Sequence, residues 1–146
     1  MKELEQLIYL RVTNDTDPIY GLMVLLGDQS HFIHAFQNDI PEVPYLTYQI
    51  FNQVRGQLGG NFNRSLELFV QFNIFAADYM DIANRLRQLF DGYRFDVPGD
   101  YTTIGQARGV FDLEQSDAYD EQLEVQLKQV RYRFFVTPKA WNPITA

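Results

Sequence analysis

The chain has 146 residues, a formal net charge of −7 and no cysteine. The length suits one domain with one hydrophobic core, and the lack of cysteine excludes disulfides and thiolate metal sites. An acidic chain gains little from neutralising phosphate, which argues against nucleic-acid binding.

The amino-terminal sequence MKELEQLIYLRV has neither an uninterrupted apolar stretch nor a cleavage-site pattern, so we expect no signal peptide. No segment approaches the roughly 20 apolar residues of a membrane helix, and we expect a soluble chain. The 12 Phe and 9 Tyr favour self-association, because aromatic side chains are enriched at protein interfaces.

Residues 1–28 are predicted to form a helical segment. Apolar residues recur at helical spacing within residues 3–13, which predicts a first helix. Asp17 followed by Pro18 is typical of an N-cap and the first residue of a helix. A second, short helix is therefore predicted to begin there and to end at Gly27.

Strands are predicted next, at residues 31–36 and, more clearly, at residues 45–54, which are rich in aromatic and β-branched types. From Ser65 onward apolar and polar residues alternate, and one face collects Leu66, Leu68, Val70, Phe72 and Ile74. The two longer strands should form an antiparallel hairpin with one buried face and one wet face.

An amphipathic helix is predicted over residues 78–90. Asp78 can cap its first turn, Asp81 adds negative charge there, and Gly92 supplies the carboxyl-terminal stop. The apolar stripe of this helix should pack on the apolar face of the hairpin.

Two more strands are predicted at about residues 102–111 and 122–136. Apolar positions change parity along the last one, which predicts a β-bulge near residues 128 and 129. The sequence therefore indicates a single α+β domain: a mostly antiparallel sheet of four to five strands, packed on one face by helices. Its core should span residues 44–136, followed by an extended tail at residues 137–146.

Candidate metal and catalytic residues are few. His31 and His34 are spaced so that they would point to opposite faces of a strand, which favours two ordinary histidines over a metal pair. Ser30, Ser65 and Ser116 are the only serines, and none has the glycine context of a nucleophile elbow. We expect no enzyme activity and no cofactor.

An acidic run could hold a divalent cation or supply an acid/base pair. It lacks the spacing of a calcium-binding loop, and a solvated connection between two strands is the favoured interpretation. Its members are Asp112, Glu114, Asp117, Asp120, Glu121 and Glu124.

A glycine-rich stretch at residues 56–60 is not followed by Lys-Ser/Thr, so it is interpreted as a hairpin tip and not as a phosphate loop. Arg55 and Arg64 flank it and could dock on an acidic neighbour, although two solvated arginines would fit equally well.

The order of elements from residue 44 to residue 136 resembles the tail-completion (tail terminator) family of long-tailed, siphovirus-like bacteriophages. The resemblance is carried by Pro44-Tyr45-Leu46-Thr47-Tyr48 opening a strand, the glycine-rich tip, the second strand, the helix with its Gly92 stop, the acidic connection, and the closing strand that ends Val130-Arg131-Tyr132-Arg133-Phe134-Phe135-Val136.

The resemblance implies a structural protein of the virion, located in the tail or neck and assembled in the host cytoplasm. Six copies would form a ring that caps the tail tube, stops its polymerisation and offers a surface to the head connector. Its partners would be further copies of itself, the tail tube protein and the neck proteins, with sheets lining a channel that DNA crosses without specific binding. No membrane partner is implied.

A cyclic ring requires that one patch of each subunit meet a different patch of its neighbour. We expect these patches at the strand edge and the hairpin tip, which comprise Tyr45, Tyr48, Phe51, Arg55, Gly56, Leu58, Gly59, Gly60 and Arg64. The alternatives are a neck or head-completion protein, a tube subunit, a cellular binding module with an aromatic face, and an enzyme that uses the acidic run.

Overall fold

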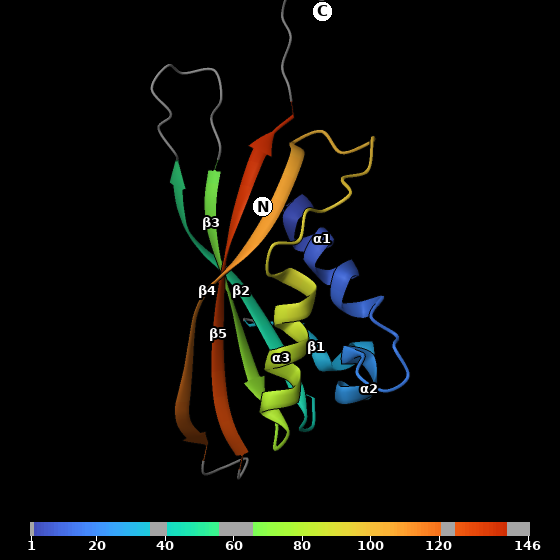
Figure 1. The fold of residues 1–146 in the computed structure, drawn as a ribbon, viewed down its shortest axis with the longest axis vertical. Coiled ribbons are helices and arrows are strands. Elements are labelled where there is room, and N and C mark those ends of the chain that lie inside the picture. Colours follow the sequence, from blue (N-terminus) through green and yellow to red (C-terminus); the bar gives the residue numbers. More distant parts are fainter. Residues whose placement is uncertain (1, 36–40, 56–65, 121–124, 140–146) are drawn as a thin grey trace, which may run out of the picture.

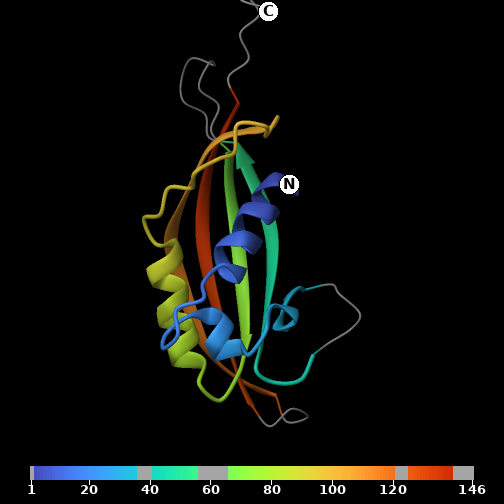
Figure 2. The same cartoon turned by 90° about the vertical axis from the view of Figure 1, so that its right-hand side faces the viewer.

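The computed structural model describes residues 2–35, 41–55, 66–120 and 125–139, with the side chains of residues 52–55, 116–120, 125 and 126 left out. Five strands form one sheet in the order β1-β2-β3-β5-β4. Figures 1 and 2 show all three helices on one face of this twisted sheet. This arrangement confirms the predicted α+β class.

The elements follow the predicted order along the chain. They are α1 (Lys2–Thr13), α2 (Leu22–Leu26), a short 3-10 turn (Gln29–His31), β1 (Phe32–His34), β2 (Tyr45–Arg55), β3 (Leu66–Phe75), α3 (Tyr79–Phe90), β4 (Ile104–Asp120) and β5 (Val125–Pro138). β1 pairs with β2 in parallel, whereas the other neighbouring strands are antiparallel.

The predicted hairpin of β2 and β3 is confirmed, and its tip lies outside the described residues. Leu68, Val70, Phe72 and Ile74 are all buried, as the alternation along β3 predicts. The even-numbered residues of β5 from Val130 to Val136 are buried on the same face.

Aromatic rings join the sheet to α3 at the centre of the core. Phe90, at the end of α3, lies 5.4 Å from the ring of Phe72 and 6.0 Å from that of Tyr132, centroid to centroid. Phe134 is 5.9 Å from Phe90. The predicted packing of α3 on the hairpin is confirmed at β3, and because Tyr132 and Phe134 belong to β5, the helix also packs across β4 and β5.

The second helix is shorter than predicted. Asp17 caps a turn before the helix, because its carboxylate accepts hydrogen bonds from the amides of Ile19 (3.0 Å) and Tyr20 (2.8 Å). These hydrogen bonds lower the pKa of Asp17. The helix itself begins at Leu22, and Gly27 ends it with a φ of 97°, as predicted.

The predicted side-chain cap at Asp78 is also wrong. Asp78 occupies the residue before α3, but its carboxylate makes no capping hydrogen bond. The predicted stop is confirmed, because Gly92 follows the helix with a φ of 75°, a conformation that glycine adopts at little cost.

The acidic run does not form a connection between strands. β4 continues to Asp120, so Asp112, Glu114, Asp117 and Asp120 belong to a strand, while Glu121 and Glu124 lie outside the described residues. The prediction failed because carboxylates with partners on β5 can stay in a sheet, which the sequence pattern does not reveal.

The predicted bulge in β5 is wrong as well. The pairing of β5 with β3 is continuous from Leu127 to Val136, and the irregularities lie in β4, after Ile104, Phe111 and Ser116. The parity change has another cause, since Lys128 takes a core-facing position and is only 4% exposed.

Helix α1 is attached to the loop before β4 through Glu3. Its carboxylate accepts hydrogen bonds from the amides of Thr102 (2.9 Å), Thr103 (3.0 Å) and Ile104 (2.9 Å). Desolvation acts to raise the pKa of Glu3, but these hydrogen bonds together outweigh it and the pKa is lowered.

Gly109 allows the chain after α3 to approach β4 closely. A Cβ atom at this position would lie 2.7 Å from the carbonyl oxygen of Phe90 and 3.0 Å from the ring of Phe134. We therefore expect Gly109→Ala to lower the free energy of unfolding by about 1–3 kcal/mol, because the added methyl group overpacks the core. Urea denaturation measures this change. Gly99→Ala is the matched control, because a Cβ there meets nothing within 4 Å. Equal stability of the two variants would contradict the prediction.

Candidate functional site

Three of the predicted interface residues have described side chains. Tyr45 is 4% exposed and stacks on Phe75, and Tyr48 faces the helices, where it stacks on Phe32. Phe51 is half-buried and stacks on Phe69. By alternation along β2, Tyr45 and Phe51 both lie on the sheet face away from the helices. Tyr45 is buried there, so of these three Phe51 is the residue on that face that remains partly exposed to a partner.

The remaining predicted residues cannot be placed as side chains. Arg55 ends β2 but its side chain is not described, and the tip residues Gly56, Leu58, Gly59, Gly60 and Arg64 lie outside the described residues. The strand edge is shorter than expected, because β1 pairs with β2 at residues 46–48. Along the described part of β2, the outer edge is open only from residue 49 to residue 55.

The two histidines have ordinary structural contacts. The Nδ1 atom of His31 lies 2.6 Å from the carbonyl oxygen of Pro44. His34 lies 3.6 Å from a carboxylate oxygen of Glu5 and meets Tyr48 edge-on. Within the described residues, no three His, Asp or Glu side chains converge in a way that could hold a metal ion.

Ser30 shows no nucleophile geometry, since its hydroxyl hydrogen-bonds the carboxylate of Asp28 at 3.1 Å. Ser65 lies outside the described residues, and the side chain of Ser116 is not described. None of the described helices has the length and apolar character needed to cross a membrane.

The sheet face away from the helices carries a charged network that sequence reasoning missed. Arg131 donates from Nε to Asp112 at 2.7 Å, and Arg133 lies 3.4 Å from the same carboxylate. Arg133 also pairs with Glu67 at 3.2 Å. The guanidinium groups of Arg131 and Arg133 lie 4.9 Å and 5.5 Å from the ring centre of Phe69.

An exposed apolar turn lies on the helical side. Ile19 and Tyr20 are each 67% exposed, more than any other large apolar side chain described. Hydrogen bonds from both backbone amides to Asp17 stabilise the turn, and Gly21 leaves no room for a Cβ beside Asp15 and Asp17. Preorganised apolar side chains of this kind suit contact with another protein.

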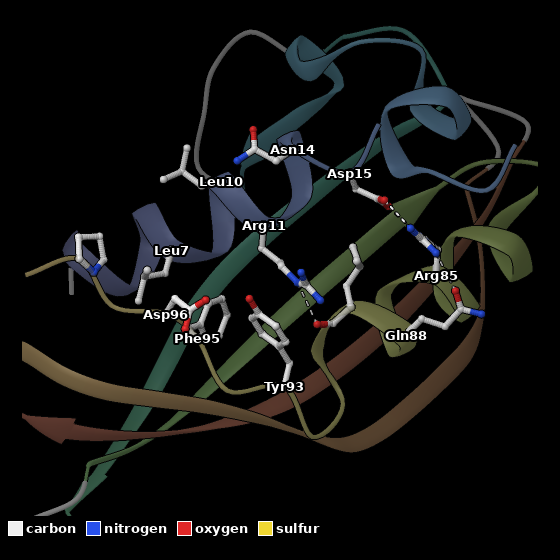
Figure 3. A pocket seen from close by; sticks show the side chains of 12 residues that line it. Leu7, Leu10, Arg11, Asn14, Asp15, Arg85, Gln88, Tyr93, Phe95 and Asp96 are labelled. Carbon is white, nitrogen blue, oxygen red and sulfur yellow. Dashed lines mark hydrogen bonds and ion pairs between the residues drawn. The ribbon is translucent and has the colours of Figure 1, made fainter. Parts of the chain in front are cut away.

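A groove of about 490 Å³ lies between α1, α3 and the segment that follows α3 (Figure 3). On its floor the Arg11 guanidinium lies 3.6 Å from the ring centre of Tyr93 and donates to the carbonyl oxygen of Leu89. At its end Asp15 and Arg85 form an ion pair. Arg11, Asp15 and Arg85 therefore already have partners within the chain, whereas Asp96 is exposed at the groove.

The pair of Asp15 and Arg85 connects residues 70 positions apart. Arg85 donates from Nε to one carboxylate oxygen at 2.8 Å and from Nη2 to the other at 2.5 Å. Asp15 also accepts from the amide of Leu22 at 2.8 Å, so it fixes the start of α2. The bond to Asp15 is the main cause that raises the pKa of Arg85 and keeps it charged.

Comparison with known proteins supports the fold. No family model matches the chain, and no curated protein matches it. Among solved structures, a chain from the structure described as the virion of a native gene transfer agent (GTA) particle is similar, with a TM-score of 0.67 and 10% identity. The match covers 93% of this chain and 96% of that chain, so the two share a fold over nearly their whole length.

We expect Arg85→Ala to lower the free energy of unfolding by about 3 kcal/mol, because it leaves a buried carboxylate without its counter-charge. The Asp15 side chain is 5% exposed, against 21% for Arg85. Urea denaturation measures the change, and Arg94→Ala, which removes an exposed guanidinium, is the control and should change stability by less than about 0.5 kcal/mol. A loss no larger than the control's would show that the pair contributes nothing.

Proposed function

We propose that this chain is a structural protein of a phage-like particle, and that it completes the tail. The observation that carries the proposal is the fold shared over 93% of the chain with a component of a gene transfer agent virion. The finer role, tail termination by a homohexameric ring, rests on the resemblance carried by the order of elements from residue 44 to residue 136.

The chemistry of the described residues agrees with a role in assembly. Arg11, Asp15 and Arg85 of the groove between α1 and α3 have partners within the chain, and the described side chains offer neither a metal cluster nor a nucleophile with its base. We therefore propose that the chain is not an enzyme, and that it acts by contacts with copies of itself and with tail and neck proteins.

The net charge of −7 suits a protein that DNA passes without binding. Like charge repels phosphate, and the term that dominates nucleic-acid affinity is then unfavourable. In the proposed ring the helices lie outside and the uncovered sheet face lines the channel, because this face lacks a covering layer in the subunit (Figure 1).

The proposed role is tested on tails. Deletion of the gene from its phage should yield overlong, headless tails beside filled heads, because nothing stops the tube from polymerising. Electron microscopy of the lysate measures tail length and head attachment. Tails of normal length joined to heads would refute the role, and tails of normal length left unattached would instead favour the alternative of a neck or head-completion protein.

The ring interface is proposed to join the open edge of β2, residues 49–55, and the hairpin tip to a different patch of the neighbour. Charge reversal of Arg55 and Arg64 together should then reduce head joining and ring formation, because the two side chains flank the tip. Analytical ultracentrifugation and tail microscopy give the readout, and reversal of the exposed Lys2 and Arg94 is the control. Unchanged rings and joined tails would exclude the tip.

A further inference from the structure

We propose that Asp112 keeps Arg131, and in part Arg133, from binding DNA phosphate at the uncovered sheet face by holding them in ion pairs. This inference rests on the proposed function, because it concerns the face that would line the channel. It adds a specific device to the general repulsion by net charge, since an exposed arginine can bind phosphate even on an acidic protein.

The pairing leaves little of the positive charge available. Asp112 is 14% exposed and contacts both arginines, at 2.7 Å to Arg131 and 3.4 Å to Arg133. Arg133 has Glu67 as its second carboxylate, at 3.2 Å. Two arginines and two carboxylates thus form a network with no net charge on the surface that the helices leave open.

Aromatic rings hold the guanidinium groups against the sheet. Arg131 lies over Phe69, 4.9 Å from the ring centre, and 6.0 Å from that of Phe51. Arg133 lies 5.5 Å from the centre of the Phe69 ring. Because attraction between a guanidinium group and an aromatic ring adds to the ion pairs, the two side chains are held where their carboxylate partners are favoured over an external phosphate.

A β-bulge in β4 allows the Asp112 carboxylate to contact both arginines. Val110 is paired with Arg133 and Leu113 with Arg131, although the two β4 residues are three positions apart and the two arginines only two. The extra residue of this bulge therefore falls between the two arginines. In a regular strand Asp112 would lie opposite a single residue of β5. Here its two carboxylate oxygens contact both arginines.

Removal of the Asp112 charge should expose Arg131 most. Arg133 would keep Glu67, whereas Arg131 would lose the carboxylate with which it pairs. One additional phosphate contact steepens the dependence of log affinity on log salt by about 0.9, which at about 50 mM salt corresponds to roughly tenfold tighter binding.

The test is fluorescence anisotropy of a labelled DNA duplex titrated with the purified full chain at several salt concentrations. We expect Asp112→Asn to bind roughly tenfold tighter than the control at about 50 mM salt, with a steeper salt dependence. Asp96→Asn is the control, because it removes the same charge from an exposed residue at the groove on the helical side. Adding Arg131→Gln to the Asp112→Asn variant should remove the gain.

The proposal is overturned if Asp112→Asn binds DNA no more tightly than Asp96→Asn, or if the gain survives Arg131→Gln. Circular dichroism first establishes that each variant is folded, and Asp112→Ser replaces Asp112→Asn if the latter is not. The assay needs neither a ring nor a phage. Its failure is therefore distinguishable from failure of the tail-terminator role, which only tail length and head joining measure.

Discussion

The helical layer depends on one buried carboxylate. Asp15 lies in the link between α1 and α2, accepts the first amide of α2 through Leu22, and receives both donor positions of Arg85 from α3. One side chain thus fixes three helices relative to each other. Because a buried charge without a partner is costly, this arrangement excludes packings in which α3 is rotated or displaced, and it holds the turn with Ile19 and Tyr20 at a defined place on the surface.

Aromatic residues have different roles on the two faces of the sheet. Toward the helices, Phe72, Phe90 and Tyr132 pack ring against ring, and burial raises the pKa of Tyr132 strongly, so it stays neutral. On the other face, Phe69 serves as a platform for two arginines that carboxylates neutralise. One face of the sheet therefore packs into the apolar core, and on the open face the arginines beside Phe69 are neutralised by carboxylates.

Local sequence patterns predicted those features of the fold that depend on residues close together in the sequence. The alternation along β3 identified its buried face, and Gly92 marked the end of α3. Both signals are local, because they depend on the spacing of apolar residues and on the positive φ that glycine adopts. The pair of Asp15 and Arg85 spans 70 residues and has no local signature. The acidic run was misinterpreted for the same reason, since Asp112 remains in a strand only because β5 presents its arginines opposite.

The two open edges of the described sheet differ in how they are protected. Beyond Phe111 the outer edge of β4 carries Asp112, Glu114, Asp117 and Asp120 and two irregularities, features by which natural sheets avoid pairing with another chain. Residues 49–54 of β2 include no charged residue, with one irregularity after Phe51. A strand edge without such protection is suited to be covered, so in the proposed ring β2 is the edge that a neighbouring subunit would cover, whereas the charged and irregular edge of β4 disfavours such pairing.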